Sequence, residues 1–131
     1  MDIDNLRRII PLKSNKFMET NPIFVRIGGH CNAYPEDILS LKGDINYTIL
    51  SFTNGDTKIV ATTLKILEER LLPFGFYRTH KNSIVNMKFV KKLIRKKDKL
   101  FVKLTNADQL LVSRRREAGL FELTNELQTA I

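Results

Sequence analysis

The sequence predicts a mostly β, antiparallel fold with one amphipathic helix and a short C-terminal helix. From residue 23 onward, short runs rich in Val, Ile, Phe, Tyr and Thr alternate with turn residues. The pair Asn54-Gly55 is a strong hairpin signal. Apolar residues recur three or four apart over 63–72 and 113–127, which predicts helices there. A chain of 131 residues has room for one core-forming domain.

Residues 1–22 are expected to form an arm outside the core, because Pro, Ser and Asn residues interrupt any long period there. The domain proper then spans residues 23–131. Its first strand is expected at 24–27 and ends at the glycine pair that follows it.

Two further strands are expected at 37–42 and 47–53, and a returning strand at 57–61. We expect a type I′ turn at Asn54-Gly55, which requires positive φ at both central residues.

Leu64, Leu67 and Leu71 predict an amphipathic helix over 63–72 that a threonine caps and Pro73 stops. We expect its apolar stripe to pack on the sheet, because most amphipathic faces serve a core.

The remaining strands are expected at 76–80, 89–95, 100–104 and 109–112, with a hairpin at 106–108 between the last two. Alternate residues of 100–104 are apolar, so one face of this strand is expected to be buried and the other partly wet.

The positive charge is confined to one region. Residues 1–77 are electrically neutral, whereas residues 78–116 hold thirteen Lys/Arg against two acids, which gives that segment a net charge of +11. Such a segment is expected to meet a polyanion. A basic surface kept for solubility is the alternative.

The predicted terminal helix begins with an unfavourable charge distribution. Ser113 is a good N-cap, yet Arg114, Arg115 and Arg116 follow it at the positive end of the helix dipole. A backbone phosphate bound there would turn that penalty into affinity. Pairing of these arginines with Glu117, Glu122 or other acids is the alternative.

A second set of donors lies in residues 76–86, where apolar anchors alternate with side chains suited to phosphates and base edges. The alternative for His80 is a structural histidine that bonds the backbone, and Asn86 could equally cap a turn. The donors are Arg78, His80, Lys81, Asn82 and Asn86.

An enzyme is not predicted, since the sequence has no Gly-rich phosphate loop and no paired carboxylates near a histidine. Cys31, His30 and His80 offer no zinc-ligand spacing, so no metal or cofactor is expected. No apolar run approaches the roughly 20 residues of a membrane span, and no signal peptide is visible, so we expect a cytoplasmic protein without membrane contact.

Four motifs in order carry a family resemblance. The run 76–86, an aromatic-apolar strand, a basic hairpin and the run 110–116 together resemble the LytTR family of bacterial DNA-binding domains. The strand start at 37–39, the Asn46-Tyr47 pair and the Asn54-Gly55 hairpin agree with it. The resemblance covers about residues 23–131.

The resemblance implies an elongated antiparallel β-sheet fold whose loops enter successive major grooves of DNA. Family members are usually output domains of two-component response regulators and bind as dimers to paired direct repeats. Carried over by position, the DNA-contacting residues would be Asn46, Tyr47, His80, Lys81, Asn82, Arg114 and Arg115.

Among these residues, we expect Lys81 and Arg115 to read base edges. The family commonly has Arg-Ser where this chain has Lys81-Asn82, so the preferred base can differ, because Lys lacks a planar fork. Arg78 and Arg116 are added as further donors. Lys96 and Lys97, on the hairpin before residue 100, are expected to clamp phosphates.

The predicted function is therefore a sequence-specific transcription regulator that binds double-stranded DNA, as a homodimer. An RNA-binding or electrostatic protein-interaction module is the alternative. Most aromatic residues lie in core patterns, whereas RNA binding favours exposed ones, so duplex DNA is preferred.

The sequence has no receiver domain, so phosphorelay control is not encoded in it. We expect a stand-alone regulator, and an excised output domain is the alternative. A frayed terminus is the default expectation for the arm over 1–22, and a dimer contact or docking of another regulator are the alternatives.

Overall fold

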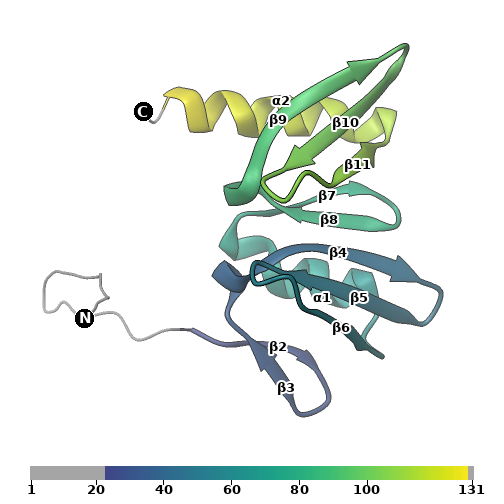
Figure 1. The fold of residues 1–131 in the computed structure, drawn as a ribbon, viewed down its shortest axis with the longest axis vertical. Helices are drawn as coiled ribbons and strands as arrows, with labels where there is room; N and C mark the ends of the chain where they lie inside the picture. Colours follow the sequence, from purple (N-terminus) through teal and green to yellow (C-terminus); the bar gives the residue numbers. More distant parts are fainter. Residues whose placement is uncertain (1–22, 130–131) are drawn as a thin grey trace, which may run out of the picture.

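The fold is that of a computed structural model, which describes residues 23–129. It contains a five-stranded antiparallel sheet of order β6-β5-β4-β8-β7, a three-stranded sheet of order β11-β10-β9, and a β2-β3 hairpin (Figure 1). The strands are β2 (Val25–Gly28), β3 (Cys31–Ala33), β4 (Ile38–Asp44), β5 (Tyr47–Phe52), β6 (Thr57–Val60), β7 (Phe76–His80), β8 (Ser83–Asn86), β9 (Val90–Lys96), β10 (Lys99–Leu104) and β11 (Gln109–Val112). The helices are α1 (Leu64–Leu71) and α2 (Arg114–Thr129), and short 3-10 turns cover Pro35–Asp37, Leu72–Phe74 and Met87–Phe89.

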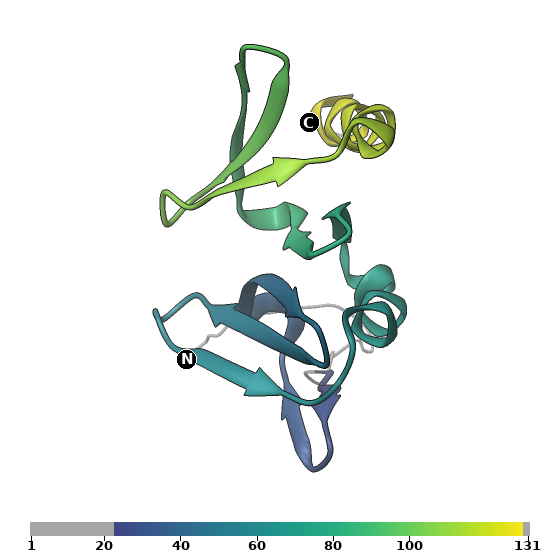
Figure 2. The ribbon, with the colours of Figure 1, turned by 90° about the vertical axis from the view of Figure 1, so that its right-hand side faces the viewer.

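The elements are stacked along the long axis of the molecule (Figure 1). The three-stranded sheet and α2 form one end, the β7-β8 hairpin the middle, and β4, β5 and β6 with α1 the next layer; the β2-β3 hairpin lies at the other end. Both helices lie on the same side of the strands (Figure 2). The predicted mostly β, antiparallel fold is confirmed.

Two hydrophobic clusters share the β7-β8 hairpin. Phe76 and Ile84 belong to the cluster under α1, whereas their chain neighbours Tyr77 and Val85 belong to the cluster under α2. Adjacent strand residues point to opposite faces, so this hairpin is covered on both sides. It therefore holds the two ends of the molecule together.

The apolar stripe of α1 packs in the core, as expected. Leu64, Leu67 and Leu71 are all buried, and Thr63 occupies the N-cap position. The apolar face of β10 is likewise buried, so its predicted alternation is correct. No helix in the described part of the chain is long and apolar enough to cross a membrane.

Two strands were not predicted from the sequence. β3 is only three residues long, and its Asn32 and Ala33 have little β preference. β8 follows directly on the donor-rich turn at 81–82, and its first and last residues are the polar but buried Ser83 and Asn86. Burial on both faces stabilises this strand, which an alternating pattern does not reveal.

The Asn54-Gly55 hairpin is present, but the expected type I′ turn is wrong. Gly55 has φ 94°, while Asn54 is not at positive φ. The amide of Gly55 donates to the carbonyl of Phe52 (3.0 Å), and the amide of Phe52 donates to the carbonyl of Asp56 (2.9 Å). This is a three-residue loop that ends in a left-handed residue. The Asn54 Oδ1 atom accepts from the Asp56 amide (2.9 Å) and thereby holds the turn.

The β10-β11 hairpin repeats this geometry with alanine in place of glycine. Ala107 has φ 76°, and its amide donates to the Leu104 carbonyl (2.9 Å). The Asn106 Oδ1 atom accepts from the Asp108 amide (3.1 Å). The hairpin predicted at 106–108 is thus confirmed.

Candidate nucleic-acid interface

The β4-β5 and β7-β8 turns lie at the same edge of the five-stranded sheet. β4 and β8 are antiparallel neighbours, with Lys42 opposite Ser83, so the end of β4 adjoins the start of β8. The Gly43 amide donates to the Asn82 carbonyl (2.8 Å) and links the two turns directly. Asn46 and Tyr47 are exposed next to this link.

The start of α2 is fixed beside the end of β7. The Ser113 amide donates to the Thr79 carbonyl (2.9 Å), and the Tyr77 hydroxyl donates to the Arg116 carbonyl (2.7 Å). Burial raises the pKa of Tyr77, and the positive charge of Arg116 opposes that shift. A Cβ at Gly119 would lie 2.5 Å from the Tyr77 hydroxyl oxygen, which explains why a glycine interrupts the apolar stripe of this helix.

The β9-β10 turn approaches the start of α2 from the other sheet. Arg114 forms an ion pair with Asp98 (3.1 Å), and both side chains are more than 70% exposed. Such a pair contributes little to stability. Lys96 lies over the Phe101 ring at 5.6 Å and donates to the Gln109 Oε1 atom (3.3 Å), whereas Lys97 is exposed at the tip with φ 57°.

These segments define one side of the molecule, which we call the loop edge. Figure 1 shows all of them on the right-hand side, and they face the viewer in Figure 2. The loop edge consists of the turns 44–47, 80–82 and 97–98 and the helix start 113–116. The turns 53–56 and 105–108 lie on the opposite edge, since each joins the other ends of antiparallel strands.

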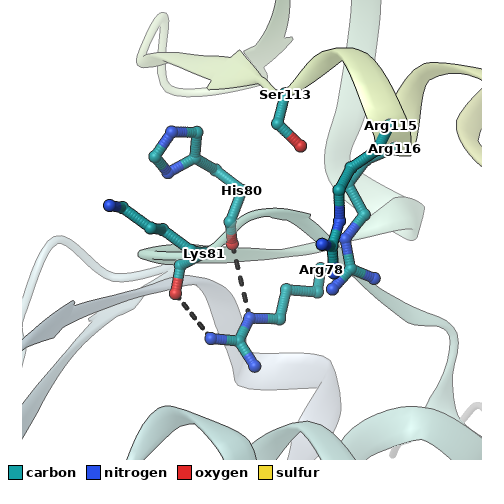
Figure 3. Close-up of a pocket in the computed structure, with 6 residues that line it drawn as sticks. All are labelled: Arg78, His80, Lys81, Ser113, Arg115 and Arg116. Atoms are coloured by element: carbon teal, nitrogen blue, oxygen red, sulfur yellow. Dashed lines mark hydrogen bonds between the residues drawn. The ribbon is translucent and has the colours of Figure 1, made fainter.

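A cavity of about 310 Å³ lies between the β7-β8 turn and the start of α2. The side chains of Arg115 and Arg116 run down toward Arg78, and the Ser113 hydroxyl points into the same space (Figure 3). This is a concave, strongly cationic site. Its lining residues are Arg78, His80, Lys81, Ser113, Arg115 and Arg116.

Arg78 uses most of its guanidinium donors for hydrogen bonds within the chain. Its guanidinium group donates to the carbonyls of His80 (3.4 Å) and Lys81 (2.5 Å) and pairs with Glu68 of α1 (2.9 Å). Only 17% of its side chain is exposed. Arg78 therefore fixes the backbone of the β7-β8 turn and presents the side chain of Lys81 to solvent.

His80 and Asn86 bond to the backbone, as expected for a structural histidine and for an asparagine that caps a turn. The His80 Nδ1 atom accepts from the Asn82 amide (3.2 Å). Asn86 is buried, donates to the carbonyls of Pro35 and Ile38, and accepts from the Lys88 amide. His80 still lines the cavity, whereas Asn86 lies away from the loop edge.

Arg114 pairs with Asp98, as the alternative proposed, but none of the three arginines of α2 pairs with Glu117. That carboxylate binds Arg95 instead (3.1 Å). Arg115 forms no ion pair with another described residue, and the same holds for Lys81; both side chains are exposed. These two side chains are therefore accessible to a partner.

Sequence reasoning missed Ile45, which lies at the tip of the β4-β5 turn. It has φ 54° and is 92% exposed. The pairing of Asp44 with Tyr47 leaves a loop of only two residues, and no motif in the sequence signals this strain. Among the described residues, no group of three His, Cys, Asp or Glu side chains could hold a metal ion.

Cations presented from several turns along one edge of a mostly antiparallel β domain are typical of a polyanion-binding domain. Comparisons with known proteins identify the family of polyanion-binding domains to which the chain belongs. The LytTr DNA-binding domain family matches residues 31–125, so the chain belongs to that family and is a DNA-binding domain.

The fold is shared with a solved structure from the same family. That structure is the LytTr DNA-binding domain of a Bacillus cereus protein described as a candidate methyl-accepting/DNA response regulator. The TM-score is 0.65 at 17% sequence identity, and the match covers 81% of this chain and 98% of the other. None of the curated proteins that were compared matches the chain significantly.

Proposed function

We propose that this domain is a transcription regulator that reads the sequence of double-stranded DNA through its loop edge. The observation that carries the proposal is the convergence of the β7-β8 turn and the α2 start on one cationic cavity, with Lys81 and Arg115 exposed at its rim. Two more turns, 44–47 and 97–98, extend the same edge along the molecule.

The cavity suits one backbone phosphate. Its guanidinium groups offer charge-assisted hydrogen bonds, and Ser113, Arg115 and Arg116 at the start of α2 line it, so the positive end of the helix dipole adjoins the same space. A phosphate there positions the domain but carries no sequence information.

Sequence would be read by the exposed side chains on either side of that phosphate. Lys81 and Arg115 can donate to guanine O6 and N7, and Asn46, Tyr47 and Asn82 can bond other base edges. Lys96 and Lys97 at the β9-β10 turn, and Arg114 at the start of α2, would contact phosphates alone.

The family suggests the biological setting. We propose a cytoplasmic bacterial regulator that binds as a homodimer to paired direct repeats, in the way that the output domains of two-component response regulators bind. It performs no catalysis and requires no cofactor. The arm over 1–22 lies outside the described residues and would contact a second regulator.

The decisive test is selection of binding sites from a random duplex pool at near-physiological salt. We expect a short motif that recurs at about one or two helical turns. The selected duplex is then titrated against single-stranded RNA of the same length. Recovery of no motif, with binding that vanishes as salt rises, or preference for the RNA, would contradict the proposal.

A further inference from the structure

The β4-β5 turn contains a residue that its geometry disfavours. Asp44 pairs with Tyr47, so Ile45 and Asn46 alone form the loop. Ile45 adopts φ 54°, in the left-handed region. Turns of this length normally place Gly, Asn or Asp there, because a β-branched side chain collides with its own backbone.

Burial does not compensate for this conformation. Ile45 is 92% exposed, the most of the large apolar residues exposed in the described chain. A single exposed isoleucine is ordinary on a protein surface. An exposed isoleucine at positive φ strains the backbone and gains nothing from burial on folding, and residues strained in this way cluster at functional sites.

The position of the turn indicates what the side chain meets. The bond between Gly43 and Asn82 ties this turn to the β7-β8 turn, so Ile45 belongs to the loop edge. Tyr47, 55% exposed, lies beside it.

The chemistry of the turn differs from that of the cationic cavity. Residues 44–47 hold one carboxylate, an isoleucine, an amide and a phenol, and no cation. The Asp44 carboxylate repels phosphate, so the turn does not suit the DNA backbone. An apolar side chain beside an amide instead suits base edges in the major groove, where thymine presents its C5-methyl group.

We propose that Ile45 is a specificity-determining residue that packs against a thymine C5-methyl group in the major groove. This assignment rests on the proposed function, because it requires the loop edge to bind duplex DNA. It makes thymine at one position preferable to cytosine, which has no methyl group there.

The test replaces each thymine of the selected duplex in turn by deoxyuridine, which lacks only the C5-methyl group. At one position per half-site, the affinity of the native protein is expected to fall about fourfold, the factor that burial of one such carbon is worth. Base pairing and the phosphate contacts are unchanged by this replacement.

The variant Ile45→Asn removes the apolar side chain and introduces a residue that tolerates positive φ. It should fold at least as stably as the native protein, and it should bind the thymine and deoxyuridine duplexes equally. The matched control is Ile59→Asn on β6, since Ile59 is also exposed (65%) but lies on the outermost strand of the sheet. This control should keep the fourfold difference.

Each outcome separates the two proposals. If a motif is selected but no thymine responds to deoxyuridine, or if Ile45→Asn keeps the fourfold response, the assignment of Ile45 is wrong and DNA reading by the other residues stands. If Ile45→Asn weakens binding to all duplexes equally, Ile45 is an unspecific contact and the assignment also fails. If no duplex motif is selected at all, the proposed function itself fails.

Discussion

The turns on the two edges of this molecule differ in how their polar and charged side chains are satisfied. On the opposite edge, the turns 53–56 and 105–108 share the pattern Thr-Asn-X-Asp, and in each the asparagine side chain bonds the aspartate two residues later. On the loop edge, the tips hold Ile45 and Lys97 at positive φ, and Lys81 and Arg115 extend into solvent.

This difference separates turns that close a hairpin from turns that meet a partner. The opposite edge satisfies its hydrogen bonds locally, and its charges are balanced by neighbouring donors. Both edges hold non-glycine residues at positive φ, since Ala107 on the opposite edge has φ 76°. Only the loop edge keeps unneutralised charge that folding alone would not select. The functional surface can thus be recognised by what its turns leave unsatisfied.

The largest effect is expected at the rim of the cationic cavity. Arg115→Ala and Lys81→Ala should each cost about 1–3 kcal/mol of DNA binding and relax the preference at one base pair. Titration of the selected duplex and its single-base variants measures both quantities. Lys58→Ala, which removes an exposed cation from β6, is the matched control and should leave affinity unchanged.

Affinity losses in Lys58→Ala as large as those in Arg115→Ala would contradict the division into two edges. Binding would then follow net charge and not the placement of charge.

The next effect is expected behind the loop edge, at the contact of Tyr77 with Gly119. Gly119→Ala places a Cβ 2.5 Å from the hydroxyl oxygen that holds the Arg116 carbonyl. The overpacking should exceed the gain in helix propensity and destabilise the fold by about 1 kcal/mol, as thermal unfolding measures.

Tyr77→Phe provides the control for that prediction, since it removes the oxygen atom in conflict. Gly119→Ala should cost less in the Tyr77→Phe background than in the native one. Equal costs in both backgrounds would show that Gly119 is present for a reason other than Tyr77.

The fold could be predicted from the sequence where local chemistry decides. The stripe of Leu64, Leu67 and Leu71, the alternation in 100–104 and the asparagine turns each act within a few residues, and each was located correctly. β8 escaped prediction because burial on both of its faces depends on two separate cores.

The candidate site was predicted only in part, for the same reason. Charge patterning located the cationic segments, but their meeting in one cavity depends on the tertiary bond between Ser113 and Thr79. Sequence alone also could not show that Arg78 bonds within its own turn. The backbone conformation of Ile45 follows from strand register, which has no signal in the residue itself.

The two asparagine turns offer a test of the opposite edge itself. Gly55 and Ala107 occupy the same left-handed position, with φ 94° and 76°. Ala107→Gly should therefore stabilise the fold by up to about 1 kcal/mol, and Gly55→Ala should destabilise it by a similar amount. Chemical denaturation measures both changes, and neither variant should alter DNA affinity.

Effects of the same sign in these two variants would show that the turns are not equivalent despite their shared pattern. A change in DNA affinity would instead place the opposite edge in the interface.

The smallest effect is expected at the tip of the β9-β10 turn. Lys97→Ala replaces one non-glycine residue at positive φ by another, so it leaves the backbone of the turn unchanged. Because it removes one exposed cation, it should weaken binding to all duplexes alike by less than about 1 kcal/mol. The slope of log affinity against log salt should decrease by about one unit, because one counterion fewer is released. Lys81→Ala should instead alter which base is preferred. If both variants changed specificity equally, Lys97 would contact bases and the phosphate contact assigned to this turn would be wrong. The loop edge would then read sequence along its whole length.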